Sequence, residues 1–342
     1  MKFRLILLFL PLLFSSCLSV MNYNIQVLEP AESAKFPLMN SVLLINRTII
    51  DDENLLMLPD NSGINITKNL HNLATTEIIF SLAETLNESP GIEFIDENRL
   101  LEMPGITPGV VPDVFPPVLV KYFCDSLDVK TIISLESFKA SYFDTVTVIQ
   151  GRLNSSEMVY QMGSRLYSDS FWRIYEGESG ELIDEYSLSD TLTWKHETND
   201  AGKISRLFLP TIEVMLHEAG KKTSMACAGR ISPVWVEQER KFFAGGNYKL
   251  SVAAHYIQNN QLDEAEQIYT QLLSGNNASM VAAASYNLAF VHEMRGNFTE
   301  AHAWARRSYI HHKKPLFAEY IEILEDRIKK SNILDRQLGD FR

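Results

Sequence analysis

The sequence contains little cysteine and none of the residue spacings that mark metal or catalytic sites. Cys17, Cys124 and Cys227 are the three cysteines among 342 residues, and no two of them have the close spacing that zinc sites require. The HExxH, GxSxG and CxxC motifs are missing, as is a phosphate-binding loop. We therefore expect no enzyme, with no catalytic residue, no metal and no cofactor.

Basic residues are also outnumbered by acidic ones. The chain has 31 lysines and arginines against 43 aspartates and glutamates, so its net charge is −12 with neutral histidines. Binding a nucleic acid requires a basic face that neutralises phosphates. The composition therefore argues against a nucleic-acid partner.

The apolar run at the N-terminus is too short to cross a bilayer of roughly 30 Å as a helix. It extends from Leu5 to Phe14 after two cations, which is typical of a signal peptide. The following Ser15-Ser16-Cys17 completes a stretch that resembles the bacterial lipobox, where cleavage precedes a cysteine that then carries lipid. We expect residues 1–16 to be a lipoprotein signal peptide, with lipid on Cys17 and a polar tether over residues 17–40. The alternative is an ordinary signal peptide followed by a chance cysteine.

Residues 41–230 have the pattern of an α/β domain. A continuous apolar run over residues 41–47 predicts a strand buried on both faces, and a helical stripe over residues 70–86 is followed by a predicted strand at residues 92–96. This order implies parallel strands joined by a right-handed crossover. Another buried strand is predicted at residues 130–137, and the β-branched and aromatic stretches beyond it predict antiparallel strands. The expected sheet is therefore mixed.

Prolines interrupt this pattern between residues 104 and 117. They recur at positions 104, 108, 112 and 116, and each removes a backbone donor and fixes φ, so neither a helix nor a central strand can form. The segment is either an exposed docking site for a partner or a stiff loop wrapped across the domain, and we favour the loop.

The last third of the chain contains an internal repeat. NQLDEAEQIY (residues 260–269) and GNFTEAHAWA (residues 296–305) are offset by 36 residues, close to the period of about 34 in tetratricopeptide helix pairs. We expect tetratricopeptide-like helices over residues 235–330, with a capping helix from residue 315 and a tail over residues 331–342. The stretch from residue 235 to 248 is expected to be helical as well. The predicted fold class is thus α+β, a mixed sheet domain followed by helical repeats.

Equivalent residues of the two repeats have equivalent expected roles. Ala265 and Ala301 begin the second helix of each pair, and Asn260 and Gly296 occupy the preceding turn, where a left-handed backbone is needed.

Such arrays often bind a peptide in their groove. Tyr256, His292 and Asn287 are the candidate residues for a partner groove. A short array can instead serve only as a brace between domains, and the sequence does not decide between these alternatives.

The assembled features resemble a family of Bacteroidota lipoproteins of unknown function. The residues that carry the resemblance are Cys17, Ile45-Asn46-Arg47, Trp172, Tyr175, the run DTLTW at 190–194, RKFFAGGN at 240–247 and the helix pair from residue 286 to 305. The resemblance implies a protein of the cell envelope, anchored in the outer membrane and facing the periplasm. It also suggests O-glycosylation at Asp-Ser/Thr-aliphatic triplets, on Ser126, Thr145 and Thr191.

Two functional hypotheses follow. The first is a non-catalytic, membrane-anchored interaction protein or assembly scaffold whose partner is an envelope protein or a peptide segment. The alternative is a lipoprotein that binds a small ligand or glycan at its α/β domain, for which Trp172 and Trp194 would be exposed around a pocket. Cys124 and Cys227 could form a disulfide in an exported chain or remain single buried thiols.

Overall fold

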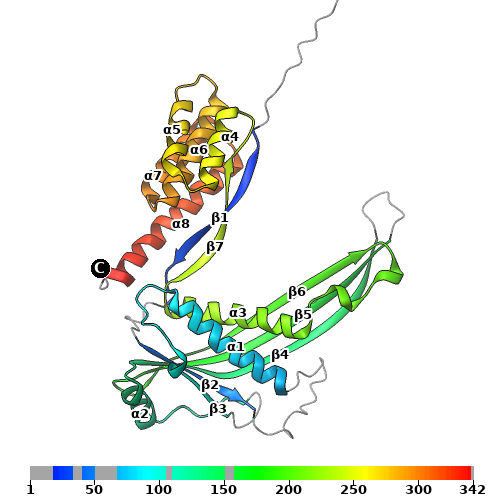
Figure 1. The fold of residues 1–342 in the computed structure, drawn as a ribbon, viewed down its shortest axis with the longest axis vertical. Helices are drawn as coiled ribbons and strands as arrows, with labels where there is room; N and C mark the ends of the chain where they lie inside the picture. The colour runs from blue at the N-terminus through cyan, green and yellow to red at the C-terminus, as the bar shows by residue number, and fades with distance from the viewer. Residues whose placement is uncertain (1–17, 34–40, 51–67, 105–109, 151–157, 340–342) are drawn as a thin grey trace, which may run out of the picture. The chain divides into compact units, whose positions relative to one another are not determined.

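The computed structural model describes residues 18–33, 41–50, 68–104, 110–150 and 158–339, and the chain divides into two compact units. The sheet unit comprises Leu28–Trp235 and Leu334–Arg342, and the helical unit comprises Met1–Val27 and Val236–Ile333. Figure 1 shows the elements of both units. None of the helices in these described ranges is both long enough and apolar enough to cross a membrane.

The sheet unit is built on a five-stranded sheet with the order β3-β2-β4-β5-β6. The strands are β2 (Val42–Ile49), β3 (Leu100–Pro104), β4 (Thr131–Gln150), β5 (Met158–Glu176) and β6 (Leu182–Thr198). Strand β2 is parallel to both of its neighbours, whereas β4, β5 and β6 are antiparallel to one another. The predicted mixed sheet is confirmed.

Helices α1 (Lys68–Asn87) and α3 (Ile212–Ile231) pack against each other and against the sheet (Figure 1). They approach closely because α3 presents small residues at the contact. A Cβ added at Gly220 would lie 3.2 Å from Ile78, and the Ser224 hydroxyl donates to the Ile78 carbonyl at 2.7 Å. Helix α2 (Pro117–Leu127) contributes to a separate apolar cluster with alternate residues of β2, including Leu43 and Ile45.

Residues 92–96 do not form the predicted strand, and β3 begins later, at Leu100. The Asn87 side chain explains the difference because it takes the backbone groups that a strand would use. Its Oδ1 accepts from the Ile95 N–H at 2.7 Å and its Nδ2 donates to the Ile95 carbonyl at 3.2 Å. A 3₁₀ turn at Glu97–Arg99 then leads into β3.

Among the described residues, the helical unit contains five helices and a two-stranded sheet. The helices are α4 (Tyr248–Gln258), α5 (Leu262–Leu272), α6 (Ala278–Met294), α7 (Phe298–His311) and α8 (Pro315–Leu338), and the strands are β1 (Val20–Glu29) and β7 (Val234–Phe243). Helix α6 is the centre of the core, since every residue from Val281 to Val291 is buried. An all-helical region thus follows the sheet unit in the chain, as expected.

The turns of the repeat have the predicted backbone. Asn260 and Gly296 have φ values of 56° and 76°, so both occupy the left-handed region. The equivalent Ala265 and Ala301 are fully buried, which allows the helices of each pair to approach closely. Side-chain volume at these sites is therefore limited by packing.

Two expectations at the borders of the helical unit were wrong. The stretch predicted to be helical from Trp235 forms β7, and the segment predicted to be a tether over residues 17–40 contains β1. The strands pair because the sequence of β7 alternates between buried and exposed residues, with Arg240 and Phe242 inward and Glu239 and Lys241 outward. A period of two is the pattern of a strand.

Candidate functional site

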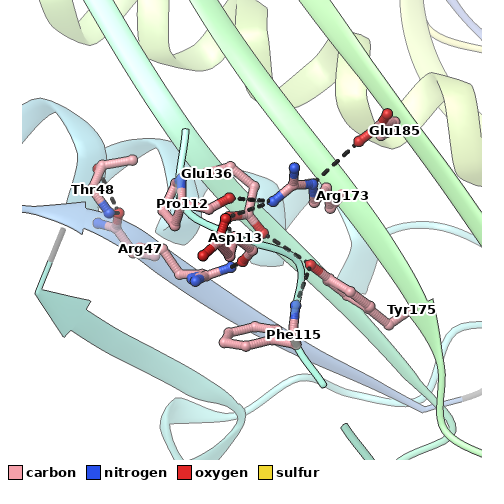
Figure 2. Close-up of polar contacts among 10 residues, drawn as sticks. Arg47, Thr48, Pro112, Asp113, Phe115, Glu136, Arg173, Tyr175 and Glu185 are labelled. Carbon is pink, nitrogen blue, oxygen red and sulfur yellow. Dashed lines mark hydrogen bonds and ion pairs between the residues drawn. The ribbon is translucent and has the colours of Figure 1, made fainter. Parts of the chain in front are cut away.

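A buried carboxylate lies at an irregularity of the central sheet. The β4–β5 register shifts between Leu135 and Ser137, and Glu136 occupies this position with 1% of its surface exposed. The Nη1 of Arg47 on β2 lies 2.8 Å from its Oε2, and the Nη1 of Arg173 on β5 lies 3.7 Å from the same oxygen (Figure 2). Three neighbouring strands therefore converge on one carboxylate.

The two arginines also hold the proline-rich segment. Arg47 Nη1 donates to the Asp113 carbonyl at 3.0 Å, and Arg173 Nη1 donates to the Pro112 carbonyl at 2.6 Å. The Arg47 guanidinium lies 3.9 Å from the centre of the Phe115 ring, as Figure 2 shows. Pro104 ends β3 and Pro117 begins α2, and the described residues 110–116 between them lie outside helices and strands. Side chains satisfy two carbonyls of this stretch. This arrangement supports the interpretation of a stiff loop.

The charges of this cluster compensate one another. Burial raises the pKa of Glu136, and the charges of Arg47 and Arg173 oppose that rise. Arg173 has a second acceptor, since its Nε lies 3.2 Å from Glu185 Oε2, and the Tyr175 hydroxyl donates to Glu136 Oε1 at 3.4 Å. We assign the cluster to holding the fold together, because its polar groups are already engaged with one another.

The helical unit has a groove between β7 and α8. Its main cavity of about 510 Å³ adjoins a smaller one of about 110 Å³. The residues that line the two cavities come from β7 (Gln238, Glu239, Arg240, Lys241), from α8 (Leu316, Glu319, Tyr320, Glu322, Ile323, Asp326, Arg327) and from α6 (Tyr286). We call this feature the β7–α8 groove.

A buried ion pair borders the β7–α8 groove. Arg240 Nε lies 3.0 Å from Glu293 Oε1 and Arg240 Nη2 lies 2.8 Å from the same oxygen, while the side chains are only 5% and 1% exposed. The Tyr320 hydroxyl donates to Glu293 Oε2 at 2.7 Å. Burial and the nearby Glu293 charge raise the pKa of Tyr320, so this hydroxyl keeps its proton. The network fixes β7 against α6 and α8.

Asn287 closes one end of the free edge of β7. Its Oδ1 accepts from the Phe243 N–H and its Nδ2 donates to the Phe243 carbonyl, both at 2.8 Å. The side-chain amide thus imitates a neighbouring strand. Because Asn287 is fully buried, it is not available to a partner, which corrects its placement among the groove residues.

The other two predicted groove residues do not line the β7–α8 groove. His292 is mostly buried, and its Nε2 lies 3.8 Å from Glu266 Oε1, while Tyr256 packs partly buried against the helical core. Sequence reasoning missed the β7–α8 groove because it read β7 as helix. The alternation of the residues around Arg240 was the signal that could have identified it.

The predicted modification sites are exposed where the structure describes them. Ser126 lies on α2, Thr145 on β4 and Thr191 on β6, and all three are exposed. Their glycosylation stays a prediction. Cys17, the predicted lipidation site, lies outside the described residues.

Cys124 and Cys227 are free and buried, so the alternative of single thiols applies. Trp172 is fully buried and Trp194 is half-buried on β6, which does not give the exposed tryptophan pair that the ligand-binding hypothesis required. Within the described residues, no group of three or more histidine, cysteine and acidic side chains is placed to hold a metal.

Solved structures with some likeness to this chain are distant. A protein from Helicobacter pylori described as a neuraminyllactose-binding hemagglutinin homologue is 12% identical, with 59% of this chain and 89% of that one covered and a TM-score of 0.34. The PelC dodecamer from Paraburkholderia phytofirmans is 9% identical, with 60% and 97% covered and a TM-score of 0.22. The hypothetical protein CT253 from Chlamydia trachomatis is 13% identical, with 56% and 97% covered and a TM-score of 0.20. Likenesses of this size carry no argument about function.

Family comparison is more informative. No curated protein matches the chain in sequence. The family model of a domain of unknown function, DUF6340, matches residues 251–326, and that of another domain of unknown function, DUF8603, matches residues 39–243. Because the DUF8603 match covers more than half of the 342 residues, the chain belongs to the family defined by this domain.

Proposed function

We propose that this protein is a non-catalytic, lipid-anchored interaction protein of the bacterial cell envelope, and that its helical unit binds a segment of another envelope protein. The observation that carries the proposal is the β7–α8 groove, an open concave surface beside a strand edge. Grooves next to open strand edges are established sites of peptide recognition. In this reading the buried Glu136 cluster maintains the sheet unit.

The N-terminal strand gives the proposed anchor a specific consequence. The carbonyl of Ser19 accepts from the Ala244 N–H at 3.0 Å and from the Gly245 N–H at 3.3 Å. Cys17 precedes Ser19 by two residues, a reach of about 7 Å. A lipid on Cys17 would therefore hold the helical unit at the membrane surface, without the intervening tether that the sequence suggested.

We further propose that α4 to α7 are two tetratricopeptide-like pairs and that α8 is their cap. Buried alanines at equivalent positions and left-handed turns before the second helices support this assignment. Arrays of this kind need three or more repeats to bury a continuous core. The β1–β7 sheet supplies additional packing here, since Phe242 stacks on Phe290 of α6 with ring centres 5.5 Å apart.

Photo-crosslinking in intact cells tests the interaction. A photoreactive amino acid would replace Ile323, which lines both cavities of the β7–α8 groove. The matched control would replace Ile310 on α7, which is 75% exposed in the same unit. We expect discrete crosslinked products from position 323 and not from position 310. No product at position 323, or the same products at both positions, would contradict the proposal.

The anchor is tested separately with Cys17→Ser. If Cys17 carries lipid, this variant leaves the membrane fraction and appears among soluble proteins, because one or more acyl chains provide the attachment. The full-length wild type is the control. Retention of the variant in membranes after washing with high salt would count against lipid anchoring at this residue.

A further inference from the structure

The free edge of β7 presents backbone groups to the β7–α8 groove. The bonds from Ala244 and Gly245 to Ser19, and the bond from Asn24 Nδ2 to Glu237 at 2.6 Å, place β1 and β7 antiparallel. In an antiparallel strand, the N–H and C=O of one residue point to the same side, and successive residues alternate.

Phe243 fixes which residues point to the free edge. Its N–H and C=O contact Asn287, not β1, and Ala244 contacts β1. By alternation, the backbone groups of Glu239 and Lys241 point to the same edge as those of Phe243. Tyr286, the neighbour of Asn287 on α6, lines the groove together with Glu239 and Lys241, so the groove lies along this edge. The Glu239 carbonyl also accepts from Arg240 Nη1 at 3.2 Å.

The opposite wall of the groove is acidic. Helix α8 contributes Glu319, Glu322 and Asp326, together with one cation, Arg327, which is 8% exposed and lies 4.6 Å from the centre of the Phe298 ring. Asp326 pairs with Lys330 at 2.7 Å, whereas Glu319 and Glu322 are exposed. The cation of Arg240 is already committed to a buried carboxylate, so it does not neutralise this wall.

We propose that the β7–α8 groove binds an extended, basic segment of the partner protein, which adds a third strand to β7 along Glu237–Lys241. Main-chain hydrogen bonds to β7 provide affinity, and lysine or arginine side chains that reach Glu319 and Glu322 provide specificity. This inference rests on the proposed interaction function and names the class of partner.

The added strand improves a weak element of the fold. A two-stranded sheet is marginal by itself, whereas three strands on an apolar surface are stable. Alternate side chains of the added strand would face α8, where Glu319 and Glu322 are exposed and Leu316 and Ile323 are half-buried. Basic side chains on this face can lay their methylene stems on Leu316 and Ile323 and reach Glu319 and Glu322 with their charged ends. The partner segment should therefore have basic residues at alternate positions, separated by apolar residues that favour a strand.

Fluorescence anisotropy with the full chain tests this inference. The probe is a short labelled peptide of alternating lysine and valine, and the matched peptides replace lysine by glutamate or N-methylate alternate backbone amides. We expect the basic peptide to bind and both matched peptides to bind at least tenfold more weakly, because one loses charge complementarity and the other loses ladder hydrogen bonds. Equal binding of the N-methylated peptide would overturn strand addition, and equal binding of the acidic peptide would overturn charge recognition.

A pair of charge reversals locates the site. Glu319→Lys with Glu322→Lys should weaken the basic peptide about tenfold. The matched control, Glu264→Lys with Glu300→Lys, makes the same change in net charge at exposed residues of α5 and α7 and should leave binding unchanged. Equal weakening by both pairs would mean non-specific attraction and would overturn the assignment of the groove.

The outcomes separate this inference from the function on which it rests. Crosslinks from Ile323 without any binding of the basic peptide would refute the strand-addition mode and leave the interaction function standing. Loss of both the crosslinks and the peptide binding would refute both.

Discussion

The buried ion pair beside the β7–α8 groove should be essential to the helical unit. Glu293→Gln keeps the shape of the side chain and removes its charge. Arg240 would then remain 5% exposed with a neutral amide in place of the carboxylate that accepts its Nε and Nη2 groups. Removing one partner of a buried pair costs about 3–5 kcal/mol because the other charge stays desolvated. The glutamine retains one acceptor oxygen, so we expect a loss of about 3 kcal/mol.

Hydrogen exchange of the α6 amides in the full chain measures this loss as a free energy of opening, without requiring the two units to unfold together. The control is Glu325→Gln, since Glu325 is 52% exposed and contacts His302 at 3.3 Å. An exposed pair contributes about 0–1 kcal/mol. The control should therefore change the opening free energy of α6 by less than about 0.5 kcal/mol.

A double-mutant cycle provides the refutation. Arg240→Met alone leaves the Glu293 carboxylate buried without its cation, whereas the double variant Arg240→Met with Glu293→Gln leaves neither charge. The double variant should lose less than the sum of the single variants, with a coupling of about 2 kcal/mol or more. Additive losses, or a loss below about 1 kcal/mol for Glu293→Gln, would show that the pair is not a coupled, desolvated unit.

Three further predictions concern titration, backbone and thiols. Burial raises the folded-state pKa of Glu136 above its unfolded value, so the stability that this group contributes is complete below the unfolded pKa and is lost as pH rises through the folded pKa. The free energy of unfolding of the sheet unit, measured from about pH 4 to 8, should show this decline in the wild type and not in Glu136→Gln. The same pH dependence in both proteins would contradict the prediction. Gly296→Ala, at a left-handed turn with open space around it, should lower the free energy of unfolding by about 1 kcal/mol. Gly180→Ala should lower it further in thermal unfolding, because its Cβ would lie 2.5 Å from a backbone oxygen. Equal losses for the two variants would contradict the clash. Burial raises the pKa of Cys124 to about 11 and that of Cys227 to about 12, so alkylation counted by mass spectrometry should modify them in denaturant only, and modification of the native protein would refute their burial.

Much of the sheet unit could be predicted from local sequence. The run at residues 41–47 became β2 because a strand that is buried on both faces needs continuous apolar residues. The strand predicted at residues 92–96 does not form because the Asn87 side chain takes the backbone N–H and carbonyl of Ile95 that a neighbouring strand would bind. Side-chain imitation of a strand depends on which residues the fold brings together, and local propensity does not contain that information.

The candidate site was less predictable than the fold. The turn conformations at Asn260 and Gly296 follow from residue type and period, which are local properties. The β7–α8 groove depends on β7 being a strand and on Asn287 closing its edge 44 residues away. The alternation of β7 was visible, but it competed with a helical expectation taken from the neighbouring repeats. Pairing with β1, which lies more than 200 residues earlier in the chain, could not be deduced from either segment alone.

The charges around the free edge of β7 explain why a basic partner is a better occupant of the groove than a second copy of this chain. Edge strands that stay unpaired invite association between identical molecules, and charged side chains on the edge oppose it. Glu237 and Glu239 are exposed on β7 beside one exposed cation, Lys241, so the exposed charges of this strand are acidic in sum and repel those of a second copy. The net charge of −12 adds repulsion at longer range. A basic segment reverses both effects, so the features that keep copies apart select a partner of opposite charge.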